Sequence, residues 1–199
     1  TDVAKEAADI VLADDDFSTI VAAIEGGRAI YANIVKFVHA MFSHNLSEVL
    51  TVFVAILLGW PLPLLPLQIL WINIVTDVFP AFALALEPPS RSIMERPPRP
   101  PGQSLLSRRF LVLILWQGAM LATIALAAYA YALQRYGAGD HARTIVLLAL
   151  ISVQIGHMFN CRSRSRSAFE GILRNPHLWF ATATVIGIRP MYAKLTAFA

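Results

Sequence analysis

Long apolar stretches constrain this chain more than any other feature of its sequence. Residues 110–133 contain no charged side chain, and a helix that crosses the hydrocarbon core of a bilayer needs about 20 mostly apolar residues. Apolar residues make up 57% of the 199-residue chain, above the roughly 45–50% typical of soluble domains. Such stretches predict membrane spans near 34–59, 64–86, 109–133, 144–161 and 177–188. The predicted fold class is therefore an all-α polytopic bundle of membrane helices.

Arginines are concentrated in two of the segments that connect these spans. The other two connections are short, and they hold only Arg135 and Arg143. Because positive charge collects on the cytoplasmic side of membrane proteins, the amino terminus and both arginine-rich segments are predicted to be cytoplasmic. Counting the spans from the amino terminus places the same segments on the cytoplasmic side. The arginines concerned are Arg91, Arg96, Arg99, Arg108 and Arg109 in the first segment, and Arg162, Arg164, Arg166 and Arg174 in the second.

Residues 1–32 have the character of a soluble segment. We expect a short helix near 2–8, a buried strand at 10–12 and a turn at 14–16. Asp16 or Ser18 can cap a second helix, whose apolar residues recur at helical spacing and continue into the first span. The membrane bundle is thus predicted to follow a short α/β remnant of a cytoplasmic domain.

The two arginine-rich connections have different predicted roles. Prolines fill residues 87–103, and because proline lacks an amide hydrogen this stretch cannot be helical. A stiff linker is favoured there over a polyproline ligand for a partner domain. Residues 162–167 alternate arginine and serine directly after a span, which favours topogenic charge and contact with anionic lipid over nucleic-acid binding. The predicted partner is the lipid bilayer, with no nucleic acid.

Two polar clusters interrupt the first and second spans. Asn45 and Glu48 are three residues apart, and Asn73, Thr76 and Asp77 follow the same helical spacing, so each set shares one helix face. The loop between the two spans is short, and the helices are therefore antiparallel neighbours. Both clusters are predicted to lie near mid-membrane and to face each other.

The chemistry of these clusters predicts a cation site. Carboxylates, amide carbonyls and a hydroxyl are the hard oxygen ligands that Ca²⁺ takes in sets of six to eight, and they suit zinc or copper poorly. Pro80 is expected to break the helix and free carbonyls for the site. The alternative is polar packing between helices, at about 0.6 kcal/mol for each contact. Polar packing is an equal alternative for Gln154 and the favoured one for His44 and His157, while Cys161 is interpreted as an inert thiol.

Several segments of the sequence also follow the pattern of one protein family. They are residues 1–12, 15–20, 27–31, 43–48, 70–77 and 85–89. These segments resemble the end of the phosphorylation domain, the stalk and the fifth and sixth transmembrane helices of P-type cation-transporting ATPases. The Asn-x-x-Thr-Asp pattern at 73–77 is most similar to that of calcium-type pumps.

This resemblance implies a division of the chain and a set of ion ligands. The ligands would be Asn45, Glu48, Asn73, Thr76 and Asp77, with Gln154 where calcium pumps often have a carboxylate. The implied cation is Ca²⁺, although the oxygen set also suits Mn²⁺, Na⁺ or Mg²⁺. The implied regions are 1–32, the end of the HAD-like phosphorylation domain and the stalk; 33–86, the ion-binding hairpin; 87–108, a cytoplasmic Pro/Arg-rich loop; 109–190, the C-terminal transmembrane helices; and 191–199, a divergent tail.

The family's phosphorylation and nucleotide-binding motifs do not occur in residues 1–199. The chain alone is therefore not expected to hydrolyse ATP. The resemblance implies partners: the actuator, nucleotide and phosphorylation domains and the first four helices of a pump, where ATP and Mg²⁺ act. It also implies a prokaryotic plasma membrane. The alternative is a truncated, non-catalytic membrane module with a regulatory, scaffold or passive-conduction role.

Overall fold

The computed structural model describes residues 2–8, 11, 16–90, 92–95, 97–100, 102, 105–162 and 175–195. Within these ranges the chain forms helices joined by turns and loops, and it contains no strand. The elements in chain order are α1 (Asp2–Glu6), α2 (Phe17–Leu57), α3 (Pro66–Trp71), the π-helix η1 (Ile72–Asp77), α4 (Val78–Ala85), α5 (Arg108–Tyr136), α6 (Asp140–Cys161) and α7 (Pro176–Leu195). The predicted all-α bundle is confirmed.

The amino-terminal region is only partly described. Helix α1 lies within the helix predicted at 2–8. Ile10 and Leu12, two of the three residues of the predicted strand, and residues 14 and 15 of the predicted turn lie outside the described residues. The α/β remnant therefore stays a prediction.

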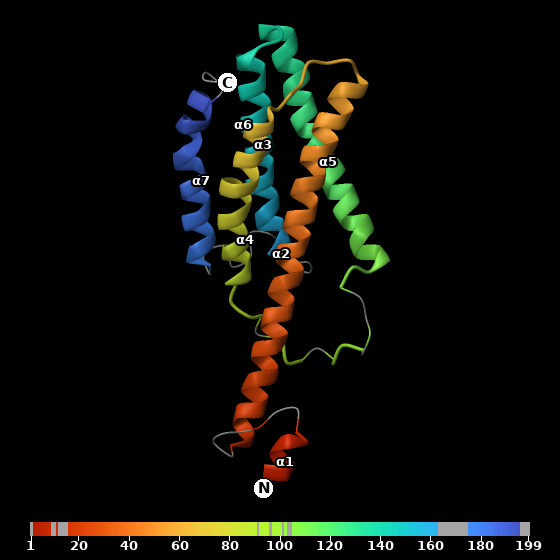
Figure 1. Cartoon of the computed structure of the whole chain (residues 1–199), viewed down its shortest axis with the longest axis vertical. Helices are drawn as coiled ribbons and strands as arrows, with labels where there is room; N and C mark the ends of the chain where they lie inside the picture. The colour runs from red at the N-terminus through yellow and green to blue at the C-terminus, as the bar shows by residue number, and fades with distance from the viewer. Residues whose placement is uncertain are drawn as a thin grey trace.

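Helix α2 begins as its sequence predicts. Oδ1 of Asp16 accepts a hydrogen bond from the backbone N–H of Ser18 at 2.8 Å, and this bond lowers the pKa of the exposed Asp16 carboxyl below its ordinary value. The helix has 41 residues, so it is about 60 Å long at 1.5 Å per residue. A bilayer core is about half that length, and the first part of α2 projects beyond the bundle (Figure 1).

Four helical segments of the described chain are long and apolar enough to cross a membrane. They are α2, the continuous run of α3, η1 and α4, and the helices α5 and α6. They match the first four predicted spans. The fifth, predicted at 177–188, lies within α7, which is long enough but is not among these four. His177, Arg189 and Lys194 lower its apolar character.

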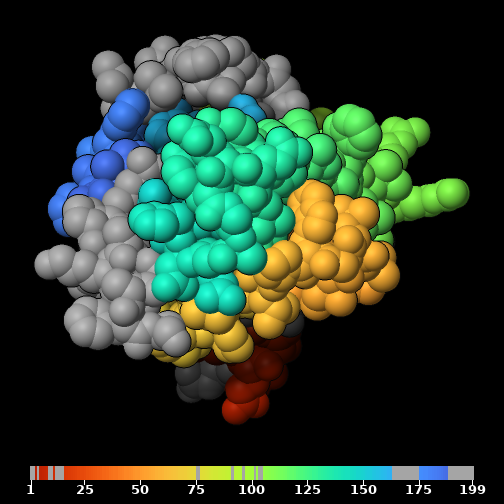
Figure 2. All heavy atoms as spheres, turned by 90° about the horizontal axis from the view of Figure 1, so that it is seen from above, coloured from red at the N-terminus to blue at the C-terminus, as the bar shows by residue number. Residues whose placement is uncertain are grey.

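The spans alternate in direction through the bundle (Figure 1). Helix α2 packs against α5, α5 against α6, and α4 against both α2 and α7. Gly137, with φ of 74°, ends α5 in a left-handed conformation that allows the tight turn into α6. This turn and the end of α2 meet at one end of the molecule (Figure 2). There, Tyr129 donates a hydrogen bond to the carbonyl of Pro61 at 2.9 Å.

Two apolar clusters of buried residues lie at different depths in the bundle. One includes Ala55, Ile72 and Leu150, and the other includes Ala40, Leu84 and Met158. The polar residues predicted to form a site lie between these two clusters in sequence. This holds on α2, on the segment from η1 to α4, and on α6. Large apolar side chains such as Phe53, Leu115 and Trp116 are exposed on the outside, as expected of a surface that faces lipid.

Candidate cation site

The second span changes its helical geometry at the predicted site. Residues Ile72–Asp77 form a π-helix between α3 and α4, and short π segments of this kind are frequent at functional sites. Asn73 and Asp77 both lie in it. We expected Pro80 to break the backbone hydrogen-bond ladder. The chain continues as α4 through Pro80, and the amide hydrogen that Pro80 lacks is the one that an α-helix would direct to the carbonyl of Thr76 in η1. Proline is tolerated in the first turn of a helix, where its missing amide hydrogen costs least.

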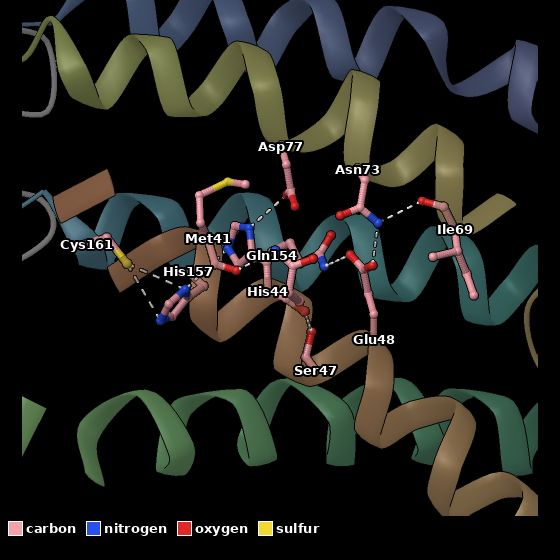
Figure 3. Close-up of polar contacts among 11 residues, drawn as sticks. Met41, His44, Ser47, Glu48, Ile69, Asn73, Asp77, Gln154, His157 and Cys161 are labelled. Carbon is pink, nitrogen blue, oxygen red and sulfur yellow. Dashed lines mark hydrogen bonds and ion pairs between the residues drawn. The ribbon is translucent and has the colours of Figure 1, made fainter. Parts of the chain in front are cut away.

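Glu48 lies at the centre of a hydrogen-bonded group drawn from three spans. Its residue is 3% exposed, and both carboxylate oxygens accept amide hydrogens. Gln154 Nε2 donates to Oε1 at 2.9 Å, and Asn73 Nδ2 donates to Oε2 at 2.9 Å. Asn73 Nδ2 also donates to the carbonyl of Ile69 at 2.9 Å (Figure 3). Three predicted site residues, 106 positions apart at the extreme, therefore meet at one point.

Asp77 lies in the same polar layer but has a different partner. It is 1% exposed, and its Oδ1 lies 3.1 Å from Nδ1 of His44. Its second oxygen, Oδ2, is buried and has no hydrogen-bond partner among the described residues, and the same holds for Oε1 of Gln154. Figure 3 shows the Asp77 carboxylate pointing from η1 toward α2 and the Glu48 carboxylate pointing from α2 toward η1.

The remaining two predicted site residues are less involved. Asn45 is half-buried, and its Nδ2 donates to the carbonyl of Met41 on its own helix at 2.9 Å. No described hydrogen bond joins Asn45 to Glu48 or Asp77. Thr76 lies in η1, but its side chain is outside the described part of the structure. The structure thus brings together Glu48, Asn73 and Gln154. Asp77 lies in the same polar layer but contacts His44 instead.

Sequence reasoning missed a third buried carboxylate, Glu87. Nε and NH2 of Arg162 donate to Oε1 of Glu87 at 3.0 and 2.8 Å, and Asn175 Nδ2 donates to Oε2. Asn33 on α2 donates to the backbone carbonyl of Glu87 at 2.7 Å. We interpreted Arg162 as topogenic charge and Glu87 as part of a linker. The available signal was that both residues border spans on the same predicted side of the membrane.

The charges of the polar layer suit an incoming cation. Among the described residues, neither Glu48 nor Asp77 has a lysine or arginine partner. A buried carboxylate is costly to keep ionised without a positive partner, and two carboxylates near each other add repulsion. A cation between α2 and η1 would relieve both costs and give the buried Oδ2 of Asp77 a ligand role. The geometry therefore favours a site for a hard cation.

These features define a class of protein: a polytopic helical membrane protein with a layer of buried polar and acidic side chains inside the bundle. Residues 61–193 match the family model described as "Cation transporting ATPase, C-terminus", which covers more than half of the chain. The chain therefore belongs to the P-type cation-transporting ATPases and corresponds to their C-terminal transmembrane region.

Curated relatives agree with this assignment. The chain is similar to the "Calcium-transporting ATPase 1" of Bacillus cereus, at 41% identity over 91% of this chain and 22% of the relative. The "Calcium-transporting ATPase" of Bacillus subtilis is 40% identical over 86% of this chain and 20% of the relative. The "Probable cation-transporting ATPase F" of Mycobacterium bovis is 45% identical over 85% of this chain and 19% of the relative. The chain thus spans about a fifth of the length of the curated relatives it matches.

Proposed function

We propose that this chain supplies the intramembrane ligands for the cation transported by an ATP-driven pump, and that the cation is Ca²⁺. The observation that carries the proposal is the pair of buried carboxylates, Glu48 and Asp77, which point toward each other's helix without a lysine or arginine partner among the described residues. Two relatives are named as calcium-transporting, which supports the choice of cation.

The proposed ligand set has enough oxygens for Ca²⁺. Ca²⁺ takes six to eight oxygen ligands, and the set offers two carboxylates, three amide carbonyls and one hydroxyl, from Asn45, Glu48, Asn73, Thr76, Asp77 and Gln154. Asn73 and Gln154 now donate their amide hydrogens to Glu48. A cation that takes over the Glu48 oxygens would let both amides rotate and present oxygen instead. Binding would thus exchange hydrogen bonds for coordination bonds without exposing polar groups.

The proposal includes the surroundings of the chain in the working pump. Actuator, nucleotide and phosphorylation domains and four further helices would carry out the aspartyl-phosphate chemistry, with ATP and Mg²⁺ bound there. The amino terminus and the segments 87–108 and 162–176 would face the cytoplasm of a bacterial plasma membrane. Cysteines introduced into these two segments should then resist a membrane-impermeant maleimide applied to intact cells.

The deciding experiment measures Ca²⁺-dependent phosphorylation of the complete pump from radiolabelled ATP in isolated membranes. Asp77→Asn keeps the shape of the side chain and removes its charge, so it should abolish the Ca²⁺-dependent phosphoenzyme. Glu48→Gln should raise the Ca²⁺ concentration that is needed for half-maximal phosphorylation. Asp140→Asn is the matched control, because Asp140 is exposed at the start of α6 and pairs with Arg143. Wild-type Ca²⁺ dependence in both Asp77→Asn and Glu48→Gln would refute the assignment.

The alternative role as a passive conductor has its own test. The purified chain reconstituted alone in liposomes should form no phosphoenzyme, because residues 1–199 contain none of the phosphorylation motifs and phosphoryl transfer needs a positioned nucleophile and a nucleotide site. If its role is to supply ligands to a pump, it should also pass no Ca²⁺ in the absence of ATP. Steady Ca²⁺ flux through the chain without ATP would favour the passive role.

A further inference from the structure

A second group of metal-ligating side chains lies in the same bundle but contains nitrogen and sulfur instead of carboxylate oxygen. His39 on α2 and His157 and Cys161 on α6 place one ligand atom each within 4.8 Å of one another. All three residues are buried, and Cys161 has no exposed surface. His39 precedes Glu48 on α2, and His157 and Cys161 follow Gln154 on α6. Figure 3 shows His157 and Cys161 to one side of Gln154 and Glu48.

The local geometry is close to that of a four-ligand site. The sulfur of Cys161 lies 3.6 Å from Nδ1 and 3.8 Å from Nε2 of His157. In a tetrahedral zinc site with bonds of about 2.0–2.3 Å, ligand atoms are roughly 3.3–3.8 Å apart. Gln117 on α5 adds an oxygen, because its Oε1 accepts from Nε2 of His157 at 3.0 Å and from Nε2 of His39. Small side-chain movements would therefore complete the coordination.

The ligand chemistry selects a different ion from the oxygen layer. Imidazole nitrogen and thiolate sulfur suit Zn²⁺, Co²⁺ or Cu⁺, whereas Ca²⁺ requires oxygen. We infer that His39, His157 and Cys161 form a transition-metal site of the zinc type, with Gln117 as the fourth ligand. Binding would convert the Cys161 thiol to a thiolate and release its proton to solvent. The site shares no ligand with the proposed calcium site, but the two adjoin: Nδ1 of His157 lies 3.4 Å from Nε2 of His44, which contacts Asp77.

Occupancy would have a structural effect on the bundle. The ligands come from α2, α5 and α6, and α5 packs extensively against both α2 and α6. A bound ion would join these three helices by coordination bonds. Any ligand that binds the folded state and not the unfolded state stabilises it. Zn²⁺ should therefore raise the unfolding temperature of the chain, and Mg²⁺, which favours oxygen, should not do so through this site.

The chain offers a clean spectroscopic test because Cys161 is its one cysteine. Co²⁺ added to the purified full-length chain in detergent should give a thiolate-to-cobalt charge-transfer band in the near ultraviolet and the visible bands of tetrahedral cobalt, at one equivalent per chain. Zn²⁺ should displace the cobalt and remove both the charge-transfer band and the visible bands. Absence of a charge-transfer band in the wild-type chain would by itself overturn the inference.

Variants separate this site from the oxygen layer. Cys161→Ser should remove the charge-transfer band, and His39→Gln should weaken Co²⁺ binding at least tenfold while the band persists at high Co²⁺. Glu48→Gln and the exposed-histidine control His141→Gln should leave both bands unchanged. If Glu48→Gln removes the cobalt bands while Cys161→Ser keeps them, the metal binds in the oxygen layer and the inference fails. Failure of this site would leave the proposed calcium ligands untouched, since their test uses Ca²⁺-dependent phosphorylation.

Discussion

Two buried acidic regions of this molecule differ in how their charge is balanced. Glu87 is paired with Arg162 and also accepts from Asn175, so both of its oxygens have strong partners. Among the described residues, Glu48 accepts only from neutral amides, and Asp77 contacts His44 with one oxygen and has no partner for the other. Both regions are comparably buried.

This difference separates a carboxylate with a structural role from the carboxylates that we propose bind a cation. The Glu87 group joins α2, α6 and the segment just before α7 to the end of α4, and its charge is cancelled within the protein. The pair of Glu48 and Asp77 carries negative charge that the described part of the chain does not cancel with lysine or arginine. The first arrangement joins several segments at the predicted cytoplasmic end of the bundle, and the second is the one that we propose binds a cation.

The largest expected effect is on stability, and it differs between the two regions. Glu87→Ala leaves Arg162 buried without its carboxylate, which should lower the free energy of unfolding by about 3–5 kcal/mol. Asp77→Asn removes an uncancelled buried charge and should cause no such loss. Denaturation in mixed detergent micelles measures both values, and a thiol-reactive dye can report unfolding because Cys161 is buried when folded.

A double variant sharpens this first test. Replacing Arg162 by Met in the Glu87→Ala background removes the unpaired charge and should recover much of the lost stability. If Asp77→Asn instead destabilises the chain as strongly as Glu87→Ala, then Asp77 has a structural role and the distinction between the regions is wrong.

The second effect concerns Ca²⁺ as a stabilising ligand. At a Ca²⁺ concentration one hundred times the dissociation constant, binding to the folded state should add about 2.7 kcal/mol to the free energy of unfolding. Glu48→Gln should reduce this gain, since it removes a ligand charge. Ca²⁺ titrations of the unfolding temperature measure the gain, with Asp140→Asn as the unaffected control. An equal gain in Glu48→Gln would place Ca²⁺ elsewhere.

A third effect tests the packing that holds the oxygen layer in place. A Cβ atom added at Gly118 on α5 would lie 2.7 Å from Cδ2 and 3.1 Å from Cβ of Leu46, the α2 residue between Asn45 and Glu48. Gly118→Leu should therefore lower the free energy of unfolding by about 1–3 kcal/mol through overpacking. Gly156→Leu is the control, because no atom lies within 4 Å of its added Cβ. Equal stability of the two variants in micelles would show that α2 and α5 separate easily.

The smallest effect is expected at Asn45. Its amide hydrogen bond stays within α2, so the side chain offers the site at most one carbonyl oxygen. Asn45→Ala should cost about 0.6 kcal/mol, a typical value for one polar contact in a membrane bundle, and should weaken Ca²⁺ affinity less than Glu48→Gln does. Isothermal titration of both variants would check the ranking. A larger loss for Asn45→Ala would make it a principal ligand.

Part of the site was predictable because helical spacing is a local property. Asn45 and Glu48, and Asn73 and Asp77, are close in the chain, and the short loop between the spans required them to be neighbours. Gln154 was predicted only as an equal alternative, since its contact with Glu48 joins residues 106 positions apart. The π-helix of η1 was not predicted, although the bond that Pro80 cannot make would have reached the carbonyl of Thr76 within it.

The sequence by itself determined where the helices cross the membrane and where α2 begins, because apolar length and the Asp16 cap act within a single segment. It also placed the polar residues at similar depths. Only the tertiary structure decided which of them meet. Three features depend on how each helix is rotated about its axis: the pairing of Glu87 with Arg162, the lack of a partner for Oδ2 of Asp77 among the described residues, and the approach of His39 to Cys161. That rotation is set by packing against neighbouring helices, and no local stretch of sequence contains it.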